Sequence, residues 1–341
     1  MSLLGRRIAR RRPSLGAALL VAALVRVGAA QALPSPILHV GSGQPYATIA
    51  AAIGGAQGHT ATVVVHAGVH ASFAIGPAAA DHLRIVAAGD GPVSIDTNLG
   101  PIVVSGTRYL QSVEFDGLTI GSPTAPAAAI VLNGNDGVVL VTSCVVASGG
   151  APALDIQSCI KTAIQKSTFV GLPGLQANGV SEIHAWTTNV ATASLAPAVA
   201  ATFCGTPAPV FTTPPGPAVT TIATPMYDLA TAATIAPGST LTIGLTLEPL
   251  GGWILAAALE PHWVDPLEPS VALITLINPL FGAFVLAVGQ ADPSGAAAAS
   301  VFIPNLAYLD GLQATFQFLG TDLLTGGFRT SHTATTMIAL P

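Results

Sequence analysis

Apolar residues recur in a repeating pattern between residues 113 and 190, where they alternate with polar residues and are separated by short turns. By subtraction of the residue numbers, the repeats start 25, 24 and 19 residues apart. Four segments line up in this way: Phe115-x-x-Leu118-x-Ile120, Leu140-x-x-Ser143-x-Val145, Ile164-x-x-Ser167-x-Phe169 and Ile183-x-x-Trp186-x-Thr188. A repeat of about 20–50 residues built from short strands is the signature of a solenoid, whose stacked repeats share one core. The pattern predicts a right-handed parallel β-helix.

Shorter elements precede these repeats. Tyr46, Ile49, Ala50 and Ile53 recur at helical spacing before Gly54-Gly55, which predicts a short amphipathic helix. In this place a helix would cover the open end of the solenoid, where the core and an unpaired strand edge would otherwise face solvent. The strands predicted around it lie at residues 37–40, 62–65, 73–75, 83–86 and 93–95.

A resemblance to a known superfamily supports this interpretation. Tyr46-Ala47-Thr48-Ile49, Ala51-Ala52-Ile53 and the strand segment Thr62-Val63-Val64-Val65-His66-Ala67-Gly68-Val69 resemble the N-terminal segment of pectate-lyase-like right-handed β-helix proteins. In that superfamily a short helix caps the solenoid and the next strand starts the first coil. The resemblance covers about residues 41–190. It implies the fold but no single activity, because the same fold hosts lyases, hydrolases, esterases and proteins without known chemistry.

The composition changes after this region. Residues 196–235 are rich in Pro and Thr, which predicts a stiff interdomain linker after a β-helix domain at 33–195. Residues 236–341 hold about seven strand candidates, as expected of an antiparallel β-sandwich accessory domain. This part is similar to C-terminal β-domains of secreted bacterial proteins. The uncharged stretch 271–289 contains Asn278-Pro279-Leu280-Phe281-Gly282, which favours a hairpin over a membrane span.

The N-terminus has the pattern of a secretory signal peptide. Five arginines between residues 6 and 12 precede an apolar run at 15–27, and Ala30-Gln31-Ala32 is a small-x-small cleavage site. The alternative is a membrane anchor, but the run is shorter than the roughly 20 residues that a spanning helix needs. We therefore expect residues 1–32 to be removed, and the protein to be secreted or placed at the cell surface without a membrane span.

Loss of the signal peptide changes the charge. Six of the 11 basic residues leave with it, so five remain against 16 acidic residues, a formal net charge of −11. Such a surface repels phosphate backbones and argues against nucleic-acid binding. Only 8% of all residues are charged, against the ~25% of a typical soluble domain, which suits a structural or binding protein better than an enzyme.

Three cysteines remain in the exported part: Cys144, Cys159 and Cys204. Export permits a disulfide bond, and an odd number leaves one thiol free. Cys144 and Cys159 lie in neighbouring repeats and could form a bridge. The alternative is that Cys144 is a small buried residue of one repeat.

Charged and polar residues gather on the predicted outer face of the solenoid. If Phe115, Leu140, Ile164 and Ile183 point inward, alternation along the strands turns their neighbours outward. Asp116 and His184 on this face, with Lys166 at the adjoining bend, are the candidate catalytic residues, for general acid–base chemistry. The candidate substrate-binding residues are Glu114, Gln165, Glu182 and Trp186. Val139, Val141 and Ala163 interrupt this cluster, so a solvated face without chemistry is the alternative.

The motifs of the superfamily's enzymes argue against activity. The hydrolases of the superfamily share paired aspartates, a Gly-His-Gly motif and an Arg-x-Lys motif. This sequence contains none of these. The superfamily's calcium-dependent lyases combine carboxylates on neighbouring repeats with an arginine base, whereas Arg84 and Arg108 both precede the cluster. His66 and His70 are four residues apart but flank Ala67-Gly68 at a strand end, so no helix presents them to a metal.

The sequence therefore predicts a secreted, non-catalytic protein with a structural or polysaccharide-binding role. The alternative is a polysaccharide lyase or glycoside hydrolase that acts on the outer face of the β-helix. No metal site and no cofactor are predicted, except calcium under the lyase alternative.

Overall fold

A computed structural model describes most of the chain. Its regular secondary structure is almost entirely β-strand, with one short helix in the described residues. The described residues are 37–56, 60–109, 111–205, 208–222, 227–232, 234–258, 284–306, 309, 312–322 and 327–338. The predicted signal peptide at 1–32 lies outside them, as does most of the predicted hairpin at 271–289. No helix in the described ranges has the length and apolar character needed to span a bilayer.

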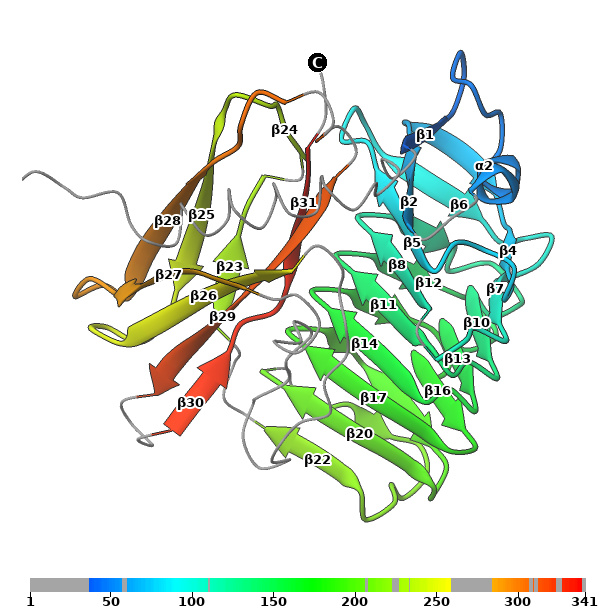
Figure 1. Ribbon diagram of the computed structural model, residues 1–341. Helices are drawn as coiled ribbons and strands as arrows, with labels where there is room; N and C mark the ends of the chain where they lie inside the picture. The colour runs from blue at the N-terminus through cyan, green and yellow to red at the C-terminus, as the bar shows by residue number, and fades with distance from the viewer. Residues whose placement is uncertain are drawn as a thin grey trace, which may run out of the picture.

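Three parallel sheets build the larger part of the molecule (Figure 1). Sheet A has the order β1 (Ile37–Val40), β2 (Thr60–Val65), β5 (His82–Ala87), β8 (Ser112–Asp116), β11 (Val138–Thr142), β14 (Lys161–Gln165), β17 (Ser181–Trp186), β20 (Val199–Cys204) and β22 (Val219–Ile222). Sheet B runs β18 (Asn189–Val190), β15 (Thr168–Val170), β12 (Val145–Ala147), β9 (Thr119–Gly121), β6 (Val93–Asp96) and β3 (Gly68–Ala71). Sheet C runs β21 (Val210–Phe211), β19 (Thr192–Leu195), β16 (Leu175–Asn178), β13 (Leu154–Gln157), β10 (Ile130–Asn133), β7 (Ile102–Ser105) and β4 (Ala74–Ile75).

The chain visits the three sheets in turn. After β2 in sheet A come β3 in sheet B and β4 in sheet C, and β5 then returns to sheet A beside β2. We call each such set of three successive strands a rung. Long parallel sheets stacked in this way are compatible with the predicted parallel β-helix.

The strand register corrects the predicted alignment of the repeats. Phe115 pairs with Val141 rather than with Leu140, which pairs with Glu114 instead. Ile164 likewise pairs with Ala185 rather than with Ile183. Residues 138–141 are all apolar, so alternation could not show which of them face inward, and a slip of one residue moves a strand's side chains to the opposite face. The aligned segments are Phe115-x-x-Leu118-x-Ile120, Val141-x-x-Cys144-x-Val146, Ile164-x-x-Ser167-x-Phe169 and Ala185-x-x-Thr188-x-Val190.

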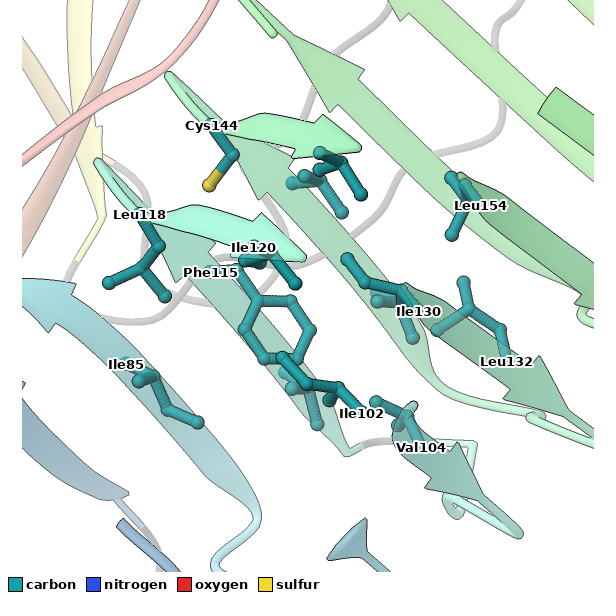
Figure 2. Close-up of a cluster of buried hydrophobic side chains, with 14 of the residues drawn as sticks. Ile85, Ile102, Val104, Phe115, Leu118, Ile120, Ile130, Leu132, Cys144 and Leu154 are labelled. Atoms are coloured by element: carbon teal, nitrogen blue, oxygen red, sulfur yellow. The ribbon is translucent and has the colours of Figure 1, made fainter. Parts of the chain in front are cut away.

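Large apolar side chains from all three sheets fill the space between the sheets (Figure 2). Phe115 from sheet A meets Ile120 from sheet B and Ile102 from sheet C, and all three are completely buried. Burial of such a side chain stabilises the fold by roughly 1.5–3 kcal/mol. Because each rung adds residues to the same column, the core is continuous along the stack.

A tight bend joins each sheet A strand to the following sheet B strand. Gly117, Ser143, Lys166 and Thr187 occupy the same place in successive rungs, one residue after the strand, with φ of 72°, 52°, 48° and 47°. The left-handed conformation costs a non-glycine residue about 1–2 kcal/mol. The bend fixes where the Lys166 side chain leaves the edge of sheet A.

A short helix lies at the N-terminal end of the stack, where the sequence predicts a cap. Helix α2 (Ile49–Gly55) starts after Thr48, whose Oγ1 accepts a hydrogen bond from the Ala51 amide at 3.2 Å. This is the ordinary N-cap interaction of threonine. Ile49, Ala52 and Ile53 are buried and belong to the same core as sheets A to C.

The C-terminal unit consists of two mainly antiparallel sheets around a second apolar core. The smaller sheet contains β23 (Asp228–Ala230), β25 (Thr240–Thr246) and β28 (Ala296–Phe302). The larger one contains β24 (Thr234–Ile235), β31 (Ala334–Ile338), β29 (Gln313–Asp322), β26 (Gly252–Ala258) and β27 (Phe284–Gln290), with β30 (Gly327–Thr330) paired to β29. The short β24 pairs in parallel with β31, and the other pairs of this sheet are antiparallel.

The segment predicted as a linker begins as part of the parallel sheets. Within residues 196–235, β20 and β22 extend sheet A and β21 extends sheet C. The physical reason is that β-branched and aromatic residues such as Val199, Thr202 and Phe203 continue the strand pattern. The proline-rich residues 214–217 lie between two of these strands, where no ladder amide is needed.

Candidate functional site

The outer face of sheet A contains the residues that were predicted from the sequence to take part in catalysis or substrate binding. Residues paired in register form columns across the sheet, because side chains alternate along each strand. The structure brings six of the seven predicted residues onto this face: Glu114, Asp116, Gln165, Glu182, His184 and Trp186. The seventh, Lys166, follows β14 at the bend. In the described register, Leu140 and Thr142 of β11 separate the acidic residues from Gln165.

The three candidate catalytic residues do not converge. Asp116 is on β8, Lys166 follows β14 and His184 is on β17, and β11 lies between the first two strands. Neighbouring strands are ~4.8 Å apart, so Asp116 and His184 are separated by about 14 Å across the sheet. A general acid and a general base acting on one bond need both groups within hydrogen-bonding reach of the substrate. The arrangement therefore gives three separate polar groups rather than one catalytic centre.

The first group is formed by Arg84, Glu114 and Asp116. Arg84 is 4% exposed, and its Nη2 donates to Asp116 Oδ2 at 2.5 Å while its Nε lies 3.5 Å from Glu114 Oε2. Burial raises the pKa of Glu114 to about 7; the positive charge of Arg84 opposes this rise, and the negative charge of Asp116 adds to it. A carboxyl group with a pKa near neutrality could donate a proton, which is the feature of this face closest to acid–base chemistry.

The second group is formed on β17. His184 Nε2 lies 2.7 Å from Glu182 Oε1, and the His184 ring stacks on Trp186 with 6.1 Å between ring centroids. Both rings are buried. A buried indole presents no face on which a sugar ring could stack, so Trp186 lacks the exposure that its predicted role in substrate binding requires.

The third group connects sheet A with the C-terminal unit. Gln165 is completely buried, and its Nε2 donates to Thr333 Oγ1 at 3.1 Å while its Oε1 accepts from the Thr333 amide at 3.2 Å. Lys166 Nζ lies 2.9 Å from Asp228 Oδ1, and buried His332 places its Nε2 2.8 Å from the same oxygen. Hydrogen bonds from His332 and then from Lys166 hold the pKa of Asp228 far below its usual range.

The C-terminal unit covers the part of sheet A where these contacts lie. Strand β31 lies beside sheet A in Figure 1, and its Met337 packs with Val64 and Val86 on the outer face. Two polar residues that were expected to bind substrate or take part in catalysis, Gln165 and Lys166, thus bind the protein's own second unit. The sequence gives no signal for this, because the partners Asp228 and Thr333 are remote in the chain.

A second polar face, on sheet C, was not identified from the sequence. Ser105, Asn133, Gln157 and Asn178 pair in register and form one column across β7, β10, β13 and β16. The three amide side chains are exposed. A second column beside it on the same face contains Asp155, Gln176 and Ser194. The two columns are joined by a hydrogen bond that Gln157 Nε2 donates to Asp155 Oδ2 at 2.7 Å. The pattern apolar-x-apolar-Asn/Gln starts at Ile130, Leu154 and Leu175. This repeat is the sequence signal from which the column of amides could have been predicted.

The cysteines remain free thiols. Cys144, Cys159 and Cys204 are all buried and unbridged, so the possible Cys144–Cys159 disulfide is not formed. Burial raises the pKa of the Cys144 and Cys204 thiols to about 12, which keeps them protonated and unreactive. Within the described residues, no cluster of three or more His, Cys, Asp or Glu side chains is arranged to hold a metal ion.

Comparison with known proteins assigns no function to these residues. No protein-family model and no curated protein matches the chain.

Proposed function

We propose that the protein is a secreted, non-catalytic parallel β-helix protein of the pectate-lyase-like right-handed kind, which binds a polysaccharide outside the cell or at its surface. The observation that carries this proposal is the column of exposed amide side chains on sheet C, Asn133, Gln157 and Asn178. The column repeats once per rung, and it lies on a different sheet from the face that contacts the C-terminal unit.

The chemistry of this column suits a neutral polysaccharide. Each amide offers two N–H donors and a carbonyl acceptor, which match the hydroxyl groups of sugars. A single such hydrogen bond contributes only about 0.5–1.5 kcal/mol, so useful affinity needs several of them in a row. Rungs ~4.8 Å apart supply this row to an extended polymer. The acidic mature chain disfavours polyanions, which leaves neutral chains as the better ligands.

An exposed aromatic side chain follows the first strand of the column in the sequence. Tyr109 is 69% exposed and follows Ser105 of β7 by four residues. Aromatic rings with one polar end are suited to surfaces that are partly apolar and partly wet. In this proposal Tyr109 adds an apolar contact to the hydrogen bonds of the amides.

The polar face of sheet A has a structural role in this proposal. Gln165 and Lys166 bind the C-terminal unit, and Asp116 is paired with buried Arg84. These contacts satisfy groups that would be costly to bury alone. The charged residues there are used to dock and stabilise the two units, rather than to bind substrate.

One observation favours a second candidate, a polysaccharide lyase or glycoside hydrolase. Glu114 has its pKa raised to about 7 next to Asp116 and Arg84, which is the kind of carboxyl pair that can act as acid and base. Calcium would enter only under the lyase form of this alternative. The 13% exposure of the Glu114 side chain and its place beside the covered part of sheet A count against it.

The two functions are separated by one experiment on the mature chain from Leu33 onward. The protein is offered neutral and uronate-containing polysaccharides with and without calcium, and both retention on the polymer and release of reducing or unsaturated ends are measured. Retention on a neutral polysaccharide without product supports the proposal. Turnover that is lost in Glu114→Gln or Asp116→Asn but kept in Asn178→Ala would establish the enzyme instead.

A further inference from the structure

Two asparagines of the sheet C column are followed directly by glycine. They are Asn133, before Gly134, and Asn178, before Gly179, and the sequence contains no other Asn-Gly pair. Both asparagines are exposed and end their strands, β10 and β16, and the two glycines have positive φ, 58° and 70°. The two pairs therefore match in sequence, in exposure and in their place within the rung.

The backbone amide of the glycine distinguishes the two pairs. Gly134 N donates to the backbone oxygen of Gln157 in the next rung at 2.8 Å, which continues the ladder past the end of the strand. By the register of β16 and β19, the equivalent acceptor for Gly179 N would be the backbone oxygen of Ala196. That oxygen accepts the Val199 amide at 3.0 Å instead, and no group in the described part of the chain accepts a hydrogen bond from Gly179 N. The Gly179 amide is therefore free of the ladder, and the residue is exposed.

The backbone oxygen of Asn178 is surrounded by donors that stabilise negative charge. Resonance in a peptide unit spreads charge from the nitrogen onto the oxygen, so a Gly179 N that loses its proton places charge on the Asn178 oxygen. Ser158 N donates to this oxygen at 3.0 Å, and Ser181 Oγ donates to it at 3.1 Å. Donors aimed at a position where charge develops lower the barrier of the step that creates the charge. Gly179 N is thus both free and activated as a nucleophile.

The fold requires glycine at position 179. Its positive φ is unfavourable for residues with a side chain, and a Cβ here would collide with Ser158 Oγ. Glycine is also the residue whose backbone nitrogen is least hindered and whose dihedral angles are least restricted. The residue that the fold needs after Asn178 is therefore the one that gives the asparagine side chain its most reactive neighbour.

We propose that Asn178 is a site of spontaneous deamidation, in which Gly179 N attacks the side-chain carbonyl carbon of Asn178. Gly179 N gives its proton to solvent and bonds to Cγ, the bond from Cγ to Nδ2 breaks, and the side-chain nitrogen takes up a proton and leaves as ammonia. Water then opens the cyclic imide. Cleavage between the nitrogen and Cγ yields an aspartyl residue, and cleavage between the nitrogen and the backbone carbonyl carbon yields an isoaspartyl residue. The reaction consumes one water molecule and releases one ammonia molecule, without oxidation or reduction.

Asn133 should resist the same reaction, because Gly134 N directs its proton at the Gln157 oxygen and must leave the ladder before it can attack. The product at position 178 carries a negative charge and lacks the two N–H donors of the amide. This inference goes beyond the proposed function and does not rest on it, because the product is identified by its covalent structure and not by binding.

The test is to age the mature protein in heavy-oxygen water at physiological temperature and mildly alkaline pH, and to locate the products by peptide mass spectrometry. In the folded protein we expect aspartyl and isoaspartyl products with heavy oxygen at Asn178, formed about 10-fold faster than at Asn133. In guanidinium chloride the ladder is lost, so the two Asn-Gly pairs should react at similar rates. Asn178→Gln should remove the product at this position, because the longer side chain would have to close a larger ring, and should leave the rate at Asn133 unchanged.

Two results would overturn the proposal. One is a rate at Asn178 in the folded protein no greater than that at Asn189, an exposed asparagine that precedes a valine. The other is an equal rate at Asn178 and Asn133 in the folded protein, which would show that the ladder bond of Gly134 gives no protection. Both comparisons use the natural chain, so they do not depend on whether a variant folds.

Discussion

Gln165 and Thr333 lie 168 residues apart in the sequence and are joined by hydrogen bonds in both directions. The Gln165 amide nitrogen donates to the threonine hydroxyl, and its carbonyl oxygen accepts the threonine amide. Gln165 is part of the outer face of sheet A, and Thr333 immediately precedes β31 of the C-terminal unit. This pair shows that the two units share a buried polar contact, so the face is not a free binding surface at this point.

Removal of the Gln165 amide should destabilise the contact between the units. In Gln165→Ala the buried Thr333 amide loses its acceptor, which costs about 1–3 kcal/mol. Urea denaturation of the mature protein measures this change. Gln157→Ala is the matched control, because it removes an exposed amide from sheet C and should change stability by less than about 0.5 kcal/mol. Equal effects of the two substitutions would show that Gln165 does not hold the units together.

The contact between the units should weaken in acid through Asp228. Its pKa is far lower in the folded protein than the ~3.9 of an unfolded chain, because His332 and Lys166 donate to it. The stability that this carboxylate contributes is therefore complete above about pH 4 and is lost as the pH falls below that value. Above pH 4, the Asp228→Asn variant should have a lower melting temperature than the natural protein. In stronger acid the two melting temperatures should become equal. A constant difference at every pH would exclude this role.

Glu114 should have the opposite pH dependence. Its pKa is raised to about 7 from the ~4.3 of an unfolded chain, chiefly by burial. The folded state thus favours the protonated carboxyl, and the stability associated with Glu114 is complete below about pH 4.3 and is lost as the pH rises to about 7. Glu114→Gln cannot ionise, so its stability relative to the natural protein should increase over that range and level off above it. Melting curves across the range test this, and a flat or falling difference would contradict the raised pKa.

The sequence predicted the parts of the fold that depend on local patterns. Helix α2 could be predicted because Tyr46, Ile49, Ala50 and Ile53 recur at helical spacing before Gly54-Gly55. The repeat of stacked strands could be predicted from the spacing of apolar residues. The register could not, because Val138, Val139, Leu140 and Val141 are all apolar and do not distinguish the inward face from the outward one.

The candidate site depended on contacts that no local pattern reveals. Glu114, Asp116 and Gln165 lie on the outer face of sheet A as predicted, because the alternation of side chains along a strand is a local property of the sequence. The partners that bury this face, Asp228 and Thr333, come from a unit whose docking is set by tertiary packing. For the same reason the amides of sheet C were missed, since nothing local shows that their face remains exposed.

The most direct test of the account compares single amide removals on two different sheets. The dissociation constant for the neutral polysaccharide that retains the protein is measured for Asn178→Ala in sheet C and for Asn189→Ala in sheet B, both exposed asparagines. Loss of one or two hydrogen bonds predicts about 3–10-fold weaker binding for Asn178→Ala and no change for Asn189→Ala. Asn133→Ala and Gln157→Ala should behave like Asn178→Ala. Binding that is unchanged in all three sheet C variants would contradict the proposal that this amide column is the binding surface.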